Sequence, residues 1–169
     1  MLSLVSRPMF RLAAVAFVVL SIQMTLCADL KPFGVTADLM LLGATATGVA
    51  GGAQRGALAG FVFGLMFDLV LVTPFGISPL VYGLAGFLAG YVRTLISDPT
   101  WWLGALAVAI ASVFGSVGVA LAGAFVGLEG QIQPGLIRTA LIVGAINGVL
   151  APAAIPVQRW CLGIKRVLV

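Results

Sequence analysis

Long apolar runs separated by short breaks constrain this chain more than any other feature of its sequence. A helix needs roughly 20 apolar residues to cross the hydrocarbon core of a bilayer. The chain offers successive runs of about this length, and we predict membrane spans at residues 9–29, 36–54, 56–73, 75–96, 102–126 and 135–156. Pro and Gly cluster between the runs, where they stop helices for steric reasons. The pattern predicts an all-α polytopic membrane protein, folded as a compact bundle of six transmembrane helices.

The scarcity of charge argues against a soluble domain. Hydrophobic residues make up 62% of the 169-residue chain, and charged residues make up only 8%. Nine basic and five acidic residues cannot cover the surface of a soluble domain of this length, whereas lipid solvates apolar side chains directly. The apolar runs are continuous rather than alternating, which argues against a transmembrane β-barrel. With no linker or extramembrane segment evident, residues 1–169 are predicted to form a single integral membrane domain.

Basic residues orient the predicted bundle. If six spans alternate in direction, most of the basic residues fall on one side of the membrane: Arg7, Arg11, Arg55, Arg93, Arg159, Lys165 and Arg166. Lys31 and Arg138 fall on the other side. The positive-inside rule then predicts that both termini are cytoplasmic. This topology also explains the net charge of +4, so we expect no nucleic-acid partner.

The residue types present narrow the possible chemistry. The chain has no histidine, which removes histidine-based nucleophile activation, metal ligation and proton relays. Cys27 and Cys161 fall at opposite ends of the predicted map, so we expect neither a disulfide nor a metal pair. Asp38 and Asp68 could approach each other near the outer interface, but neither lies in a recognisable catalytic motif. We therefore predict no enzymatic activity, no cofactor and no metal.

Glycines recur at steps of four within the predicted spans. Helices in lipid associate by close packing, and small residues at this spacing allow it. Most of these glycines are expected to pack helices within the bundle, while one stripe remains a candidate docking face for a partner helix. The candidate packing residues are Gly56, Gly60 and Gly64 in the third span, Gly86 and Gly90 in the fourth, and Gly144 and Gly148 in the sixth.

One carboxylate, Asp68, follows the third-span glycines inside an apolar run. An ionised carboxylate facing lipid costs about 2.5 kcal/mol or more near the bilayer centre, so Asp68 should face the bundle interior or a polar cavity. Its candidate partners are the backbone amides at the start of the fourth span and the side chains of Thr36, Asp38, Thr73, Ser78, Tyr82 and Arg138. Two roles stay open for Asp68: an acid that pins a helix–turn–helix corner, and a ligand or proton site.

Other polar residues within the spans are expected to bond to the backbone or across helices. Asp38, at the start of the second span, is predicted to cap that helix. Asn147 precedes Pro152, which is predicted to kink the sixth span, and it is expected to satisfy a neighbouring backbone group. Gln23 and Thr25 in the first span are predicted to form interhelical hydrogen bonds.

Residues 37–93 carry these features in an order that resembles the family of the rod shape-determining protein MreD. The motifs are, in chain order, Asp38-Leu39, Arg55-Gly56-Ala57, the Gly60, Gly64 and Asp68 series, a turn with Pro74-x-Gly76, and an aromatic-rich helix with Tyr82, Gly86 and Gly90 that ends at Arg93. A glycine stripe alone means little, but a stripe, an acid and a Pro-x-Gly turn in this order are more specific.

The resemblance implies a non-enzymatic scaffold of the bacterial cell-elongation complex, with multiple passes through the inner (cytoplasmic) membrane. Such a scaffold helps to position lateral peptidoglycan synthesis and to maintain cell shape by binding MreC. MreB, a SEDS-type polymerase and its penicillin-binding transpeptidase are further implied partners. In this interpretation a tight corner at the outer surface is formed by Asp68, Gly60, Gly64, Pro74, Gly76 and Asp38.

The same resemblance supplies an alternative function. The MreD fold is similar to that of the S components of energy-coupling-factor transporters, which bind small molecules such as vitamins. S components commonly dock their energising module through an Ala-x-x-x-Ala pattern on the first span. Here Ala13, Ala14 and Ala16 are followed four residues later by Phe17, Val18 and Leu20, so that pattern is missing. The scaffold is therefore the preferred interpretation.

Overall fold

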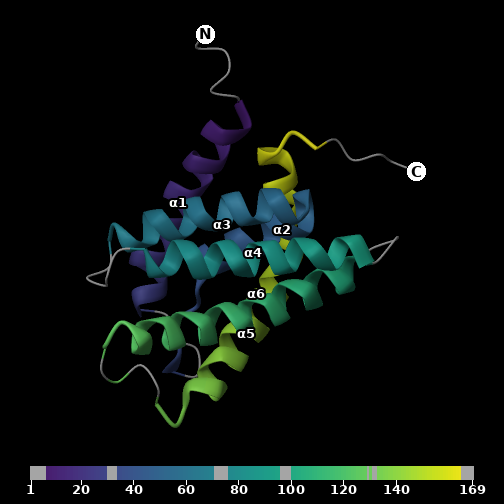
Figure 1. The fold of residues 1–169 in the computed structure, drawn as a ribbon. Coiled ribbons are helices and arrows are strands. Elements are labelled where there is room, and N and C mark those ends of the chain that lie inside the picture. Colours follow the sequence, from purple (N-terminus) through teal and green to yellow (C-terminus); the bar gives the residue numbers. More distant parts are fainter. Residues whose placement is uncertain are drawn as a thin grey trace.

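The computed structural model describes residues 7–29, 34–70, 76–95, 100–128, 130 and 133–164. Over these residues the chain forms six α-helices and no strand, which confirms the predicted all-helical class. Figure 1 shows their arrangement. The helices are α1 (Arg7–Asp29), α2 (Leu39–Gly51), α3 (Ala53–Asp68), α4 (Ile77–Leu95), α5 (Trp101–Phe125) and α6 (Leu136–Cys161).

Each helix overlaps one predicted span, but several ends differ. The break expected within residues 51–55, between the second and third spans, lies at Gly52, whose φ of +92° suits a residue without a side chain. The helix α3 ends at Asp68 rather than at residue 73. The helix α6 continues through Pro152 and Pro156, five residues beyond the predicted end at residue 156. Both prolines lie on the exposed side of the helix, and Cys161 beyond them is buried.

The short helix α2 forms the centre of the bundle. All of its residues from Met40 to Ala50 are buried, and α2 contacts each of the other five helices. Its 13 residues span about 20 Å at 1.5 Å per residue, less than the roughly 30 Å of a hydrocarbon core. Two buried hydroxyls are satisfied within the helix, since Thr45 donates to Leu41 O at 2.9 Å and Thr47 to Gly43 O at 2.7 Å. The surrounding helices therefore shield α2 on all sides.

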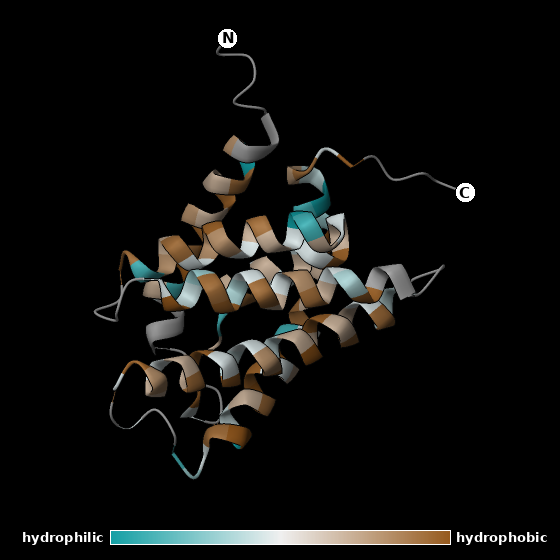
Figure 2. Cartoon of the chain, in the orientation of Figure 1, coloured by the Kyte–Doolittle hydropathy of each residue, from teal (hydrophilic) through white to brown (hydrophobic). Residues whose placement is uncertain are grey.

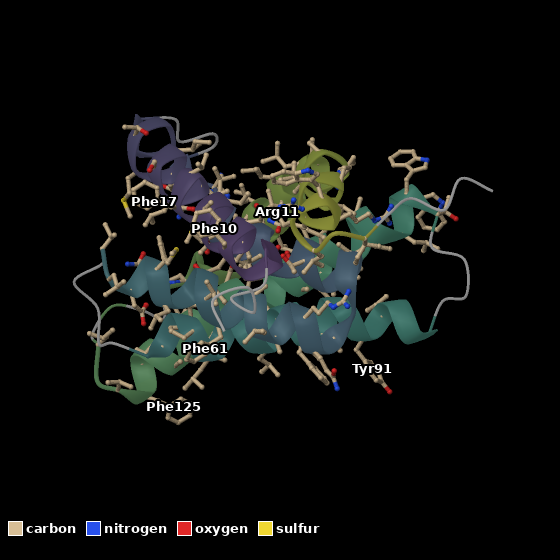
Figure 3. The ribbon with its side chains drawn as sticks, turned by 90° about the horizontal axis from the view of Figure 1, so that it is seen from above. Phe10, Arg11, Phe17, Phe61, Tyr91 and Phe125 are labelled. Carbon is tan, nitrogen blue, oxygen red and sulfur yellow. The ribbon has the colours of Figure 1, made fainter. Side chains whose placement is uncertain are left out.

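The outer surface of the bundle is strongly apolar. Many large hydrophobic side chains are exposed, among them Phe10, Phe125 and Val149 at 73%, 89% and 80%. Figure 2 shows hydrophobic residues along the lengths of α3, α4 and α5, with hydrophilic residues mainly near helix ends. In Figure 3 the side chains of Phe17, Phe61 and Phe125 project away from the ribbon. A surface of this kind is suited to contact with lipid.

Within the described residues, α5 and α6 are long and apolar enough to cross a membrane by length and composition. Three other helices contribute shorter apolar stretches: Phe10–Thr25, Leu39–Gly51 and Ile77–Val92.

The beginning of α1 and the end of α6 meet at one end of the bundle. The Arg11 guanidinium donates from Nη1 to Trp160 O at 3.4 Å and lies 4.9 Å from the centroid of the Trp160 ring. Figure 3 shows Arg11 between these two helices. Cys161 is buried here, with its Sγ 4.0 Å from Arg11 O. Cys27 lies sixteen residues after Arg11 in the same helix α1, about 24 Å further along the axis, so the two cysteines are far apart.

Candidate functional site

The glycines of α3 face the backbone of α4 directly. A Cβ atom added to Gly60 would overlap the backbone of Tyr82 and Gly83. A Cβ added to Gly64 would lie 2.5 Å from Pro79 N and from the carbonyl atoms of Ser78. No rotamer change can relieve such a contact, because the atoms on the α4 side belong to the main chain. The spacing of four residues thus brings the two helices into backbone contact.

The same contact continues toward the other end of α3. A Cβ on Gly56 would overlap Gly86 O and also approach Gly48 of α2, and a Cβ on Gly86 would overlap the carbonyl of Gly56. A Cβ on Gly90 would lie 2.5 Å from Ala53 N at the start of α3. We refer to the five glycines at positions 56, 60, 64, 86 and 90 as the α3–α4 seam.

The two candidate glycines of α6 pack against α5 instead. A Cβ on Gly144 would lie 2.5 Å from Val113 Cγ2 and 2.9 Å from Ala109 O. A Cβ on Gly148 would lie 3.0 Å from Ala109 Cβ. Both glycines therefore serve a helix contact within this chain.

Asp68 joins the end of α3 to the start of α4. Its side chain is 3% exposed, and its Oδ2 accepts a hydrogen bond from Gly76 N at 2.7 Å. Gly76 immediately precedes α4 and has a φ of +111°, a backbone conformation that favours glycine. The second carboxylate oxygen, Oδ1, is buried and has no hydrogen-bond partner among the described residues. Pro74 and Thr73 lie outside the described residues.

The other candidate partners of Asp68 differ in their exposure. The side chains of Thr36 and Arg138 are exposed, and Ser78 is buried. Among the described residues, Asp68 accepts its hydrogen bond from the backbone N–H of Gly76. Of the candidate partners, this one corresponds to the backbone amides at the start of the fourth span.

Asp38 connects three helices at the same end of the bundle. Its Oδ1 accepts from Leu41 N at 2.9 Å and caps α2, as predicted. Its Oδ2 accepts a hydrogen bond from the hydroxyl of Tyr82 on α4, whose side chain is 1% exposed. The Tyr82 ring also stacks with Phe67 of α3, with ring centroids 6.0 Å apart. Tyr82, expected from the sequence to be a candidate partner of Asp68, thus bridges α2 and α4 through Asp38.

Two amide side chains attach further helices to the start of α2. Asn147 of α6 donates from Nδ2 to Asp38 O at 3.1 Å and to Ser112 Oγ of α5 at 3.0 Å. Gln23 of α1 accepts from Met40 N at 3.0 Å. The predictions for Asn147 and Gln23 are confirmed by these bonds.

The prediction for Thr25 is wrong. Its side chain is exposed, and its hydroxyl donates to Ser21 O in its own helix. The sequence analysis did not identify Ser112 as a hydrogen-bonding residue, although a polar side chain within an apolar helix was a signal that could have marked it.

The arrangement of these groups favours holding helices over catalysis. Both carboxylate oxygens of Asp38 accept hydrogen bonds, one from Leu41 N and one from the Tyr82 hydroxyl. Asp38 is therefore engaged in structural contacts and is poorly placed to act as the second acid of a protease pair. Over the described residues, no three His, Cys, Asp or Glu side chains gather as a metal site would require.

The chain was compared with known proteins. Residues 6–155 match the family model described as rod shape-determining protein MreD. The matched segment contains the α3–α4 seam, Asp38 and Asp68. A search of curated proteins found no match, and a search of solved structures also found none.

Proposed function

Because the chain belongs to the MreD family, we propose that it is a non-enzymatic membrane scaffold of the bacterial cell-elongation complex. The family consists of membrane proteins that act in rod shape determination. In our proposal the chain helps to position lateral peptidoglycan synthesis and maintains cell shape by binding MreC. The observation that carries the proposal is the family match over residues 6–155.

We propose that all six helices form one domain that crosses the inner membrane, with both termini in the cytoplasm. The distribution of basic residues supports this topology through the positive-inside rule. The meeting of Arg11 and Trp160 supports it as well, because an even number of crossings returns the chain to its starting side.

The partner-binding element of our proposal is the corner at the junction of α3 and α4. It comprises Gly60, Gly64, Asp68 and Gly76 together with Pro74 of the connecting turn and Asp38 of α2. Backbone packing at Gly60 and Gly64 and the 2.7 Å bond from Gly76 N to Asp68 give the corner a fixed shape. Helix ends held in this way are suitable for docking, because little conformational entropy is lost when a partner binds. MreC is the proposed partner, and MreB, the SEDS polymerase and its transpeptidase complete the assembly.

The proposal is tested by replacing the gene for this chain with an inducible copy and measuring cell width. Withdrawal of the inducer is expected to round the cells, and the wild-type chain is expected to restore the rod. Asp68→Ala removes the bond to Gly76, and we expect it to restore shape poorly. Asp68→Asn is the matched control, because its amide oxygen can still accept from Gly76 N.

Two outcomes would contradict the proposal. Cells that keep their width after withdrawal of the wild-type chain would show that it has no role in shape. Normal shape with an accumulated Asp68→Ala chain would leave the family function intact but would refute the proposed corner. A nutrient requirement without a shape change would instead favour the S-component alternative.

A further inference from the structure

A small cavity with one basic residue in its wall lies where α5 begins and α6 ends. Its volume is about 200 Å³, below the roughly 300–1,000 Å³ of pockets that take drug-sized ligands, so it suits a small chemical group. Its polar wall residues are Arg159, in the last turn of α6, and Thr100, the N-cap of α5. Val49, Ile155 and Trp101 are among its apolar wall residues. We refer to it as the Arg159 cavity.

The Arg159 cavity is suited to an anion. Arg159 is partly buried, and no acidic residue is among the described residues that line the cavity. The cavity also borders the N-terminus of α5, where N–H groups lack partners within the helix and carry a partial positive charge. The Thr100 side chain makes no capping hydrogen bond to these groups. A phosphate can accept hydrogen bonds from both a guanidinium and a helix N-terminus.

An apolar cavity beside the Arg159 cavity indicates where such a phosphate would come from. Trp101 and Pro152 belong to the walls of both cavities, so the two are neighbours. No charged residue lines the apolar cavity, and its wall on α5 runs from Trp101 to Ala109. This stretch is about 12 Å long at 1.5 Å per residue, close to half of a hydrocarbon core roughly 30 Å thick. It therefore matches one acyl chain in one leaflet, which a free phosphate does not have.

Two tryptophans indicate the level of the membrane surface. Trp101 and Trp102 are 74% and 51% exposed, and tryptophan is enriched at the boundary between hydrocarbon and headgroups. Since Trp101 lines both cavities, the Arg159 cavity lies at headgroup level, and the apolar cavity extends from it toward the bilayer centre. In the topology proposed above this is the cytoplasmic surface, where basic pockets between helices bind anionic lipid headgroups.

We propose that the Arg159 cavity binds the phosphate of one anionic phospholipid, with an acyl chain in the adjoining apolar cavity. The Arg159 guanidinium donates to the phosphate oxygens, and the N–H groups at the start of α5 provide further donors. An anionic lipid binds better than a zwitterionic one, because no headgroup ammonium opposes the charge of Arg159. The inference goes beyond the scaffold function, and it depends on the proposed membrane topology but not on MreC.

The proposal is tested with the purified full-length chain in detergent, using native mass spectrometry to count bound lipids. The probes are phosphatidylglycerol, which is anionic, and phosphatidylcholine, which is zwitterionic, with acyl chains of equal length. We expect one phosphatidylglycerol to bind at concentrations where phosphatidylcholine does not. Arg159→Gln is expected to lower the affinity for phosphatidylglycerol roughly tenfold, as loss of one hydrogen bond to a charged group would. Arg159→Lys should retain part of the affinity, because it keeps the charge.

Arg55→Gln is the matched control, because it removes the same charge at the same end of the bundle. Gly51 lies between Arg55 and Leu162, which follows α6, and Arg55 does not line the Arg159 cavity. We expect this variant to bind phosphatidylglycerol as wild type does. Equal losses from both glutamine variants would indicate general charge attraction and overturn the proposal. An unchanged affinity for Arg159→Gln would also overturn it, as expected if Asp98, which lies outside the described residues, balances the arginine.

A second pair of variants tests the acyl chain without changing Arg159. Val149 lines the apolar cavity and is 80% exposed, so Val149→Trp would fill part of this cavity. Ile137→Trp is the matched control, since Ile137 is 70% exposed on the same helix and does not line the cavity. We expect Val149→Trp to weaken phosphatidylglycerol binding several-fold and Ile137→Trp to leave it unchanged. Equal effects of the two variants would contradict the proposed position of the acyl chain.

Glycerol 3-phosphate, which carries the phosphate without acyl chains, serves as a competitor. We expect it to displace the lipid only at far higher concentration. Displacement at a similar concentration would show that the site takes a free phosphate, and the proposal of a lipid site would be wrong.

The failures of the two proposals are distinguishable. If phosphatidylglycerol and phosphatidylcholine bind equally, the lipid site is wrong and the scaffold function stands. If lipid binding depends on Arg159 but withdrawal of the chain leaves cell shape unchanged, the lipid site stands and the scaffold function is wrong.

Discussion

Substitution of Gly64 by alanine tests the backbone contact between α3 and α4 at the corner near Asp68. The new Cβ would lie 2.5 Å from Pro79 N and from the carbonyl atoms of Ser78. Ordinary van der Waals contact begins at 3.4 Å, so α3 and α4 must separate by about 0.9 Å. One turn further along, the bond from Gly76 N to Asp68 Oδ2 measures 2.7 Å. A displacement of 0.9 Å along this bond would stretch it to about 3.6 Å, beyond the range of a hydrogen bond.

The energetic consequence follows from three contributions. Forcing an extra carbon into a packed contact costs about 1–3 kcal/mol. Loss of this bond leaves a buried polar group unsatisfied, which costs about 1–3 kcal/mol. Alanine stabilises the helix by about 1 kcal/mol relative to glycine through its higher helix propensity. We therefore expect Gly64→Ala to lower the free energy of unfolding by about 1–5 kcal/mol.

Thermal unfolding in mild detergent, followed by size-exclusion chromatography of the soluble fraction, measures this effect. For a chain of this length, each kcal/mol shifts the midpoint by about 2–4 °C, so we expect a drop of roughly 2–20 °C. Gly83→Ala is the matched control, because its Cβ would lie 3.3 Å from Ala57 O in the same helix pair. A midpoint for Gly64→Ala equal to that of Gly83→Ala would refute the proposed backbone contact.

Three further substitutions are expected to lower the same thermal midpoint. Tyr82→Phe removes the hydroxyl donor to Asp38, and we expect a loss of about 1.5–3 kcal/mol; an unchanged midpoint would contradict this bond. Asn147→Leu removes the bonds that attach α6 to α2 and α5, at an expected cost of about 1–3 kcal/mol, and a midpoint at or above wild type would count against it. Arg11→Gln removes the cation–π contact with Trp160, about 0.5–2 kcal/mol, whereas Arg11→Lys should retain part of it.

The class of the fold and most helix positions could be predicted from the sequence. Continuous apolar runs and sparse charge indicate helices in a membrane, and Pro and Gly mark the approximate breaks. The predicted end of the sixth span at residue 156 was too early, since α6 continues through Pro152 and Pro156 to the buried Cys161. The capping role of Asp38 was predictable because it depends on local sequence.

Contacts between distant segments could not be predicted in the same way. The apolar helix α2 has the composition of a lipid-facing span, since an apolar helix looks the same whether lipid or protein surrounds it. The hydrogen bond between Tyr82 and Asp38 joins residues 44 positions apart, so no local sequence pattern could predict it.

The central claim is that this chain acts as a scaffold within the cell-elongation complex. The most direct test is to purify the tagged chain from its native membrane in mild detergent and to identify the recovered proteins by mass spectrometry. The account predicts that MreC and the elongation synthases are recovered with it. Recovery of a transporter ATPase pair with its coupling subunit, and no MreC, would contradict the account and support the S-component alternative.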